Sequence, residues 1–342
     1  MIPKISVIIP VYNVEKYIER CARSLFEQTL DDIEYVFVND ASTDASMQVL
    51  ENVIECFPHR RERILLIDQP VNNGPSITRN LGLRNASGRY VIFCDSDDYV
   101  DLNAYESLYA KALLNDADIV ACGIDVVGSN GVDTWQLLFG QDQMQWTDLL
   151  ADFTKIEGGI YSSMCNKLIN RELLMKNNIF FDERTTMWED LYTTIRARYF
   201  AKTMYVIDVP FYHYCLHQGS IVHTDINTRV TSQVTVAKLV EGFLSDLNDG
   251  RNYDEMIAYI KFLSKASLVE VAPNKWSKIF PEATKYLMRL SKYFGRRLTF
   301  KYGLLSLGYF GVAMLVLIRS LLKTYTFCRE KLNSALLSDH KC

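Results

Sequence analysis

Short apolar runs alternate with amphipathic segments over the first 125 residues of the chain. The apolar runs predict buried strands, and the segments between them carry apolar residues at helical spacing. The predicted strands are Ile5–Pro10, Tyr35–Asn39, Ile64–Asp68, Tyr90–Cys94 and Ile119–Cys122. The predicted helices are Glu15–Gln28, Thr43–Glu55, Pro75–Arg84 and Leu102–Leu114. This alternation is typical of an α/β fold with a mainly parallel twisted sheet flanked by helices.

The pattern changes in the second half of the chain. From about Trp146 longer helical stretches alternate with aromatic-rich loops, in segments that include 162–176, 188–200 and the sequence YHYCLHQGS from Tyr212. After Gly250 only helical patterns remain. We therefore expect an α/β half at residues 1–125, a second half of the same domain at 126–250, and a helical extension at 251–342. The 342 residues are enough for one large domain and an appendage.

Charge is unevenly distributed along the chain. Residues 285–331 carry ten Lys or Arg and a single acid, whereas the preceding 284 residues carry 26 basic and 39 acidic side chains. An acidic body argues against nucleic-acid binding, and a basic tail suits an anionic membrane surface. The tail contains an uncharged stretch of 17 residues, Tyr302–Ile318, which is at the short limit for a spanning helix. Its glycines and basic flanks favour a helix in the membrane plane, with a buried core helix as the alternative.

The ends and the cysteines of the chain suggest a compartment. Met1–Lys4 leads directly into an apolar run, without the pattern of a secretory signal. The eight cysteines have neither CxxC spacing nor histidines at zinc-binding intervals, which is typical of reduced thiols. We expect a cytoplasmic protein that is peripheral on the inner face of the cell membrane.

The sequence CDSDD, with Asp95, Asp97 and Asp98, directly follows a predicted strand. Carboxylates this close together repel one another unless a positive group lies between them. Mn²⁺ or Mg²⁺ suits oxygen ligands and is often held by one or two carboxylates together with substrate phosphates. A solvated acidic turn or helix N-cap remains the alternative.

Polar residues follow two other predicted strands. In VNDASTD, Ser42 or Thr43 could cap a helix, and capping is a sufficient explanation for Ser42, Thr43 and Asp44, whereas Asp40 is left over for ligand binding. PVYN, with Pro10, Tyr12 and Asn13, offers a wall for a nucleoside or an ordinary turn. Arg79, at the start of a predicted helix, either reaches a phosphate or pairs with a strand-end aspartate. Carboxyl ends of strands are the ligand-binding edge of open α/β sheets.

Five motifs in order resemble those of family 2 glycosyltransferases, which have the GT-A fold. They are ISVIIPVYNVEKYIERCARSLFEQTL, VNDASTD, NNGPSITRNLGLRNASGRYVIFCDSDD, NKLINRELL and WEDLY, within residues 4–215. The resemblance implies transfer of a sugar from a nucleotide-sugar donor, with UDP-hexoses or their N-acetylated forms as donors. It also implies a glycan or lipid-linked glycan acceptor in cell-surface polysaccharide synthesis.

The resemblance also implies roles for individual residues. Asp97 corresponds to the metal-binding aspartate of the DxD motif, and Asp190 to the base that activates the acceptor hydroxyl, with Glu189 beside the sugar. Residues matched to the donor site are Pro10, Tyr12, Asn13, Asp40, Arg79, Asp95, Asp98 and Lys167.

One departure from the family pattern concerns the segment after the base. Similar enzymes often have YxYRxRxxS, but Cys215 and His217 stand here at the two basic positions. His217 or His213 is a candidate for replacing an arginine at the diphosphate or for binding the metal, and a packed, hydrogen-bonded histidine is the alternative. We assign His217 to the donor and His213 to the metal.

These residues predict direct displacement with inversion at the sugar carbon, because one cation and one carboxylate meet the needs of the reaction. A sugar-phosphate nucleotidyltransferase is an alternative, but its glycine-rich loop is absent after the first strand, where Val11–Val14 stands. The other alternative is an inactive, membrane-attached protein that binds sugar nucleotides. It would be expected to lack a metal or base carboxylate.

Overall fold

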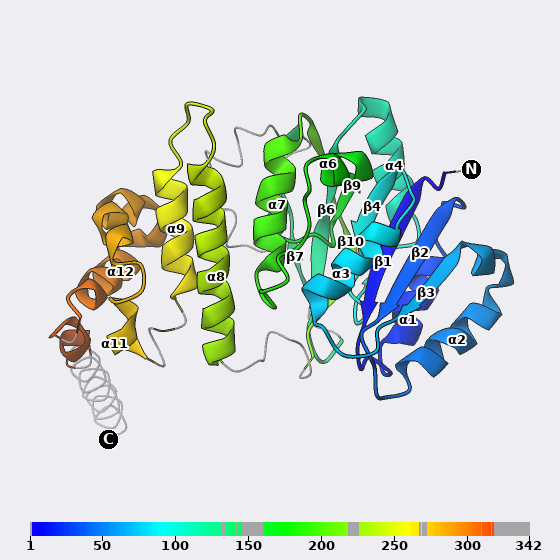
Figure 1. The fold of residues 1–342 in the computed structure, drawn as a ribbon, viewed down its shortest axis with the longest axis horizontal. Coiled ribbons are helices and arrows are strands. Elements are labelled where there is room, and N and C mark those ends of the chain that lie inside the picture. Colours follow the sequence, from blue (N-terminus) through cyan, green and yellow to red (C-terminus); the bar gives the residue numbers. More distant parts are fainter. Residues whose placement is uncertain are drawn as a thin grey trace, which may run out of the picture. The chain divides into compact units, whose positions relative to one another are not determined.

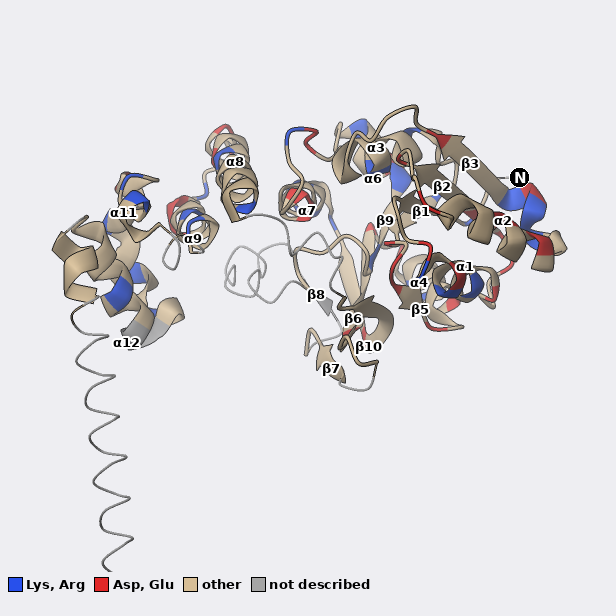
Figure 2. Ribbon diagram, turned by 90° about the horizontal axis from the view of Figure 1, so that it is seen from below, with Lys and Arg blue, Asp and Glu red and all other residues tan. Residues whose placement is uncertain are grey.

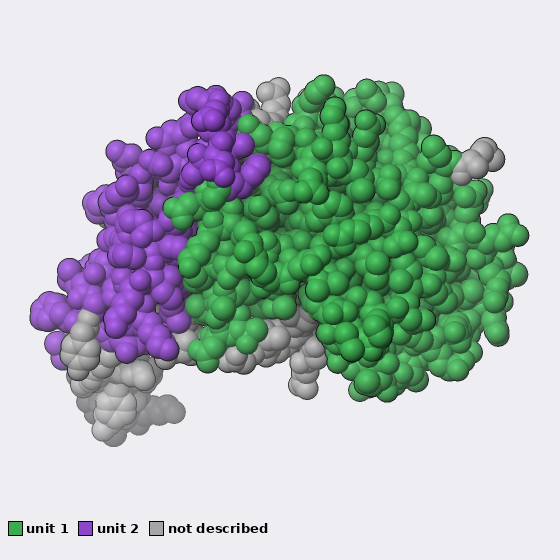
Figure 3. Space-filling model, in the orientation of Figure 1, with its two compact units in different colours: residues 1–242 green, residues 243–342 purple. Residues whose placement is uncertain are grey.

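The computed structural model describes residues 2–131, 134–140, 143–144, 160–217, 226–266, 268, 272–308, 310–315 and 317. The described chain separates into two compact units, residues 1–242 and residues 243–342 (Figure 3). The first unit contains the sheet, and the predicted boundary at residue 125 falls inside one of its strands.

The first unit is an α/β fold, as predicted (Figure 1). Its strands are β1 (Ile5–Val11), β2 (Ile33–Asn39), β3 (Ile64–Asp68), β4 (Tyr90–Phe93), β5 (Tyr99–Val100), β6 (Ile119–Val127), β7 (Thr134–Leu137), β8 (Gln143–Met144), β9 (Lys167–Asn170) and β10 (Met204–Cys215). Its helices are α1 (Ile18–Phe26), α2 (Ser46–Cys56), the 3₁₀ helix η1 (Pro58–Arg63), α3 (Pro75–Asn85), α4 (Ala104–Asn115), α6 (Arg171–Lys176) and α7 (Glu189–Phe200), and α8 (Ile226–Ser245) extends into the second unit.

The sheet is mixed, and its longest pairings are parallel, between β1, β2, β3 and β4 and between β6 and β10, in agreement with the mainly parallel sheet expected. The strand order is β3-β2-β1-β4-β9-β6-β10-β5, with β7 paired to β6 and β8 paired to β10. The first four strands of this order are parallel, but β9 lies antiparallel between β4 and β6. The strand β9 and the long strand β10 both come from the half for which helices and loops were expected.

Helices cover both faces of the sheet, which is why β1 and β4 are buried along almost their whole length. Figure 2 shows α3 on one side of the sheet and α1 and α4 on the other. The helix α3 approaches β1 closely at Gly82, where a Cβ atom would lie 2.4 Å from Cγ2 of Ile8. This glycine therefore fixes the depth at which α3 packs, and Arg79 lies one turn before it on the same helix.

The second unit contains α9 (Asp254–Ser264), α11 (Pro273–Trp276), the 3₁₀ helix η4 (Pro281–Tyr286) and α12 (Leu287–Ser306). Aromatic rings form its core: Tyr302 stacks on Trp276 and Phe262, with centroid distances of 5.4 and 5.5 Å. The ammonium of Lys265 lies 3.8 Å from the centre of the Trp276 ring, a cation–π contact.

The predicted apolar stretch 302–318 is not one continuous helix. Its first residues belong to α12, where Tyr302 is buried, and α12 ends just before Gly308, which has a φ of +65°. Residues 310–315 are helical again. Within the described residues, no helix has the length and apolar character needed to span a bilayer.

Candidate active site

The predicted chemistry gathers at the carboxyl edge of the parallel strands. Tyr12 and Asn13 follow β1, Asp40 follows β2, and the segment 95–98 follows β4. Because β2, β1 and β4 are adjacent and parallel, these residues lie along one edge of the sheet. That edge is where open α/β sheets bind ligands.

Asp40 is almost completely buried and holds the loop that precedes α3. Its Oδ1 accepts hydrogen bonds from the amide of Gln69 and the backbone N–H of Asn73, at 2.9 and 2.7 Å. Its Oδ2 accepts from the N–H of Gly74 at 2.9 Å, and Gly74 has a φ of +85° that favours glycine. Asp40 therefore organises the N-terminal end of α3, and its contact with a nucleoside stays a prediction.

Tyr12 presents an open aromatic face, with 46% of the side chain exposed. Asn13 beside it is in the left-handed region, at a φ of +52°, and its Oδ1 accepts from the N–H of Thr43 at 2.8 Å. Pro10 is half-buried near the end of β1. Tyr12 is thus the exposed member of this group, and its stacking on a base stays a prediction.

The three carboxylates after β4 have separate partners. Asp95 pairs with Arg79, and Oδ2 of Asp97 lies 2.6 Å from Nε2 of His217. Burial, and next the charge of Asp95, raise the pKa of Asp97, while His217 opposes the rise.

Asp98 is fully buried and accepts hydrogen bonds from the Tyr212 hydroxyl and from the backbone N–H of Cys215. Burial, with Asp97 and Asp95 nearby, raises its pKa well above the ordinary range. We assign Asp98 to the attachment of β10 beneath the site rather than to the direct donor contact expected from the sequence.

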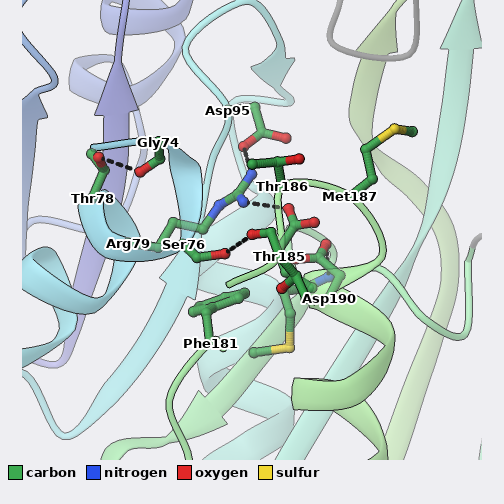
Figure 4. Close-up of polar contacts among 12 residues, drawn as sticks. Gly74, Ser76, Thr78, Arg79, Asp95, Phe181, Thr185, Thr186, Met187 and Asp190 are labelled. Carbon is green, nitrogen blue, oxygen red and sulfur yellow. Dashed lines mark hydrogen bonds and ion pairs between the residues drawn. The ribbon is translucent and has the colours of Figure 1, made fainter. Parts of the chain in front are cut away.

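Arg79 pairs with two carboxylates, one of which belongs to a residue 110 positions later in the sequence. Its Nη2 is 2.7 Å from Oδ1 of Asp95 (Figure 4), and its Nη1 is 2.7 Å from Oε1 of Glu189. The guanidinium also lies over the ring of Phe181, 5.6 Å from its centroid. Of the two possibilities open from the sequence, the structure contains the ion pair with a strand-end aspartate, and contact with a phosphate stays a prediction.

Asp190 lies in the first turn of α7, next to Glu189. Its Oδ2 accepts a hydrogen bond from the backbone N–H of Met164 at 3.0 Å. Its Oδ1 is buried and has no hydrogen-bond partner among the residues that the structure describes. Burial raises the pKa of Asp190 to about 7, opposed by Arg79 and assisted by Glu189. A half-buried carboxylate is suited to accept a proton near neutral pH when one of its oxygens accepts no hydrogen bond from the described residues.

The residue before this pair is in an unusual backbone conformation. Trp188, at the N-cap of α7, has a φ of +66° and a ψ of +9°. The left-handed region is uncommon for a bulky residue, and such strain concentrates at functional sites. The position of Trp188 directs the chain so that Glu189 and Asp190 begin the helix.

The structure places two predicted residues away from the direct contacts expected of them. Lys167 is fully buried, where its ammonium donates to the carbonyl of Ile160 and to Oδ1 of Asn166, both at 2.8 Å. Burial lowers its pKa to about 7. Lys167 therefore ties together the loop before β9, so we assign it to support of the site rather than to donor binding.

His213, which we expected on the metal, has other partners in the described structure. Its Nε2 lies 2.8 Å from Oδ1 of Asp101, its Nδ1 lies 3.6 Å from Oδ2 of Asp125, and its ring stacks on Tyr99 at 4.3 Å. The histidine on Asp97 is His217, four residues after His213 and two residues past the end of β10. We therefore transfer the metal assignment from His213 to His217.

The donor set at Asp97 fits a divalent cation shared with a substrate. Its carboxylate oxygen and the imidazole nitrogen of His217 adjoin, and Nδ1 of His217 is buried with no partner in the described part of the chain. Both ligand types suit Mn²⁺, and Mg²⁺ suits the carboxylate. No group of three or more His, Cys, Asp or Glu side chains among the described residues is arranged to hold a metal. Substrate oxygens would have to complete the coordination.

Sequence reasoning did not identify two contacts at this site. Nη2 of Arg20, on α1, donates to the backbone oxygen of Asp97 at 2.8 Å and to Sγ of Cys215 at 3.1 Å. The Met164 amide bound to Asp190 comes from the loop before β9. Neither contact could be recognised from the sequence. Arg20 is one of several charged residues on an exposed helix face, and a backbone amide can belong to a residue of any type.

The sequence is similar to that of a known protein over most of its length. The chain is 32% identical to the uncharacterized glycosyltransferase YibD of Escherichia coli strain K12 over 273 residues, which cover 76% of this chain and 75% of that protein.

Two solved structures have a similar fold at low identity. The crystal structure of S. aureus TarS 1–349 in complex with UDP-GlcNAc has a TM-score of 0.61 at 23% identity and covers 85% of this chain and 80% of that one. The mannosyltransferase PcManGT from Pyrobaculum calidifontis, in complex with GDP-Man and Mn²⁺, has a TM-score of 0.54 at 16% identity, with 96% and 83% covered.

The family model described as Glycosyl transferase family 2 matches residues 6–177, which is half of the chain. The matched region contains the strand-end residues Tyr12, Asp40 and Asp95–Asp98, together with Arg79. The chain therefore belongs to glycosyltransferase family 2.

Proposed function

We propose that this protein transfers a sugar from a nucleotide-sugar donor to a hydroxyl group in a single displacement with inversion. The observation that carries the proposal is the buried Oδ1 of Asp190, which accepts no hydrogen bond from the described residues, on a carboxyl whose pKa is raised to about 7. A base with a pKa near the operating pH is both ionised and able to hold a proton.

The bonds of the reaction balance without a covalent intermediate. The acceptor hydroxyl gives its proton to Oδ1 of Asp190 while its oxygen bonds to the anomeric carbon from the face opposite the leaving group. The bond from that carbon to the donor's diphosphate oxygen breaks, and its electron pair leaves with the nucleoside diphosphate. General-base assistance of this kind contributes about 10²- to 10⁴-fold to rate.

The leaving diphosphate needs positive charge beside it. We propose that Asp97 and His217 hold Mn²⁺ or Mg²⁺ together with donor oxygens, and the bound cation would neutralise charge on the diphosphate. The carboxylate–imidazole pair at Asp97 supports this assignment. The Mn²⁺ in the PcManGT complex is consistent with it.

For the donor we propose a UDP-sugar, either a hexose or an N-acetylhexosamine. The UDP-GlcNAc complex of S. aureus TarS, a similar fold, supports this choice. For the acceptor we propose a glycan or lipid-linked glycan of cell-surface polysaccharide synthesis. The donor is identified by incubating the purified protein with Mn²⁺ and UDP-Glc, UDP-GlcNAc or GDP-Man and measuring the released nucleoside diphosphate. Absence of release from every donor, with and without added glycan acceptors, contradicts the proposal.

We also propose that the second unit binds the anionic inner surface of the cell membrane. On α12, Lys292 follows Met288 by four residues and so adjoins it, and Phe300 is turned by about 120° around the helix from Met288. Met288 and Phe300 are 78% and 59% exposed, and Lys292 is exposed between them. Figure 2 shows further Lys and Arg on this unit. An apolar and basic helix face suits a membrane interface.

Sedimentation with vesicles containing phosphatidylglycerol tests the membrane proposal. Replacing Met288 and Phe300 by Ser should reduce binding, because both exposed apolar side chains are lost. Replacing Leu114 by Ser is the matched control, since Leu114 is 83% exposed on α4 in the first unit. Equal sedimentation of the α12 variant and the control contradicts the proposal.

A further inference from the structure

The carboxylates at the strand edge and a bound donor diphosphate together carry more negative charge than the basic side chains already paired there can neutralise. Within the described structure, three cationic or titratable basic side chains contact segment 95–98: Arg79, His217 and Arg20. Arg79 is already shared by two carboxylates, Asp95 and Glu189. His217 is engaged with Asp97. The diphosphate gains negative charge as it leaves the sugar, and Asp97 adds its own carboxylate charge, so one divalent cation does not neutralise the site during transfer.

Arg20 has the geometry to supply further positive charge. Its Nη2 donates both to the backbone oxygen of Asp97 and to Sγ of Cys215, and its guanidinium lies 4.6 Å from the centroid of the Tyr99 ring. These contacts fix the plane of the guanidinium in advance. Nε and Nη1 donate to no described protein group, so three N–H donors stay available on an exposed residue.

The position of Arg20 also accounts for the departure in the sequence after the base. Cys215 stands at the first of the two positions where similar enzymes often have arginine. In this structure, the guanidinium nitrogen of Arg20 lies 3.1 Å from the sulfur of Cys215. A guanidinium therefore occupies the space beside residue 215, but it is supplied by α1, 195 residues earlier in the sequence.

We propose that Arg20 binds the diphosphate of the nucleotide-sugar donor, a role that rests on the proposed function of this same site. Charge-assisted hydrogen bonds from a planar guanidinium are suited to phosphate oxygens, and Arg is the residue that most often supplies them. The contact with the backbone of Asp97 holds the guanidinium beside the aspartate assigned to the metal.

Binding of nucleotides with different numbers of phosphates distinguishes diphosphate binding by Arg20 from a purely structural role. Calorimetry with Mn²⁺ measures dissociation constants for UDP, UMP and uridine, with GDP, GMP and guanosine in parallel. Arg20→Gln should raise the dissociation constant of the diphosphate about 10- to 100-fold, with little change for the nucleoside. The matched control is Arg23→Gln on the same helix, because Arg23 is a partly exposed residue that pairs with Glu19 in an i,i+4 contact.

A rescue variant strengthens the test. In the Arg20→Gln background, Cys215→Arg returns a guanidinium to the same space and should restore at least part of the diphosphate affinity. Equal weakening of UDP, UMP and uridine by Arg20→Gln, or unchanged UDP binding, overturns the inference. If the wild-type protein binds neither UDP nor GDP, the proposed function fails instead.

Discussion

Replacement of Arg79 by Gln should have a large effect on stability. The change removes the buried cation between Asp95 and Glu189 and both of its 2.7 Å ion pairs. Removing one partner from a buried ion pair typically costs about 3–5 kcal/mol, because the remaining charge is left uncompensated. For a unit of this size each kcal/mol lowers Tm by about 2–4 °C, so we expect a decrease of roughly 6–20 °C.

The same change should move the pH dependence of transfer. Arg79 lowers the pKa of Asp190, whereas burial and the neighbouring Glu189 raise it to about 7. Without the guanidinium the pKa must rise, so a larger fraction of the base is protonated at neutral pH. Because the base acts in its ionised form, the acidic limb of the rate profile should shift to higher pH.

Arg84→Gln is the matched control for Arg79→Gln. Arg84 is on the same helix and also faces a phenylalanine ring, but its contact with Glu183 is 3.8 Å and both side chains are about half exposed. Such a pair contributes about 0–1 kcal/mol. Thermal unfolding and kcat/KM as a function of pH are measured for both variants. Equal Tm values, or an acidic limb that stays in place in Arg79→Gln, would refute the reasoning.

Three further changes separate chemistry from packing. Asp97→Asn should remove most Mn²⁺-dependent transfer while Tm stays near that of the wild type; full activity at limiting Mn²⁺ contradicts the metal assignment. Gly82→Ala should destabilise the first unit by about 1–3 kcal/mol, since the new Cβ meets the Ile8 side chain at 2.4 Å. Gly242→Ala has open space and should be neutral or stabilising in the same denaturant titration. Tyr12→Ala should weaken nucleotide binding about tenfold without lowering Tm, because the ring is 46% exposed; unchanged affinity argues against stacking.

The first four strands could be predicted from the sequence to within about two residues, because each is a continuous apolar run, and β1, β2 and β4 are buried on both faces. The ends of the helices were less predictable. Residues before α1 form a turn in which the N–H of Glu15 donates to Asp44, and the N–H of Val14 donates to Ser46. This network between two distant loops delays the start of α1 to Ile18. It also makes Asp44, rather than Ser42 or Thr43, the acceptor for the first turn of α2.

The strands in the second half of the first unit were harder to predict from the sequence. The strand β10 changes register between Ile207 and Tyr212, so its 12 residues show no regular alternation. The strand β9 is only four residues long. The individual carboxylates of the site were visible as strand-end and helix-start clusters, but their partners were not. Arg79 and Glu189, for example, meet only because α3 and α7 adjoin in the folded chain.

The central claim, that Asp190 is the base of a glycosyl transfer, is tested most directly with Asp190→Asn. The amide preserves the side-chain volume and can still accept from the Met164 N–H, but it cannot take a proton. Donor affinity by calorimetry and transfer rate at saturating donor are measured on the same preparation. We expect the donor to bind as in the wild type while transfer falls by about a hundredfold or more. A transfer rate within about twofold of the wild type would contradict the account.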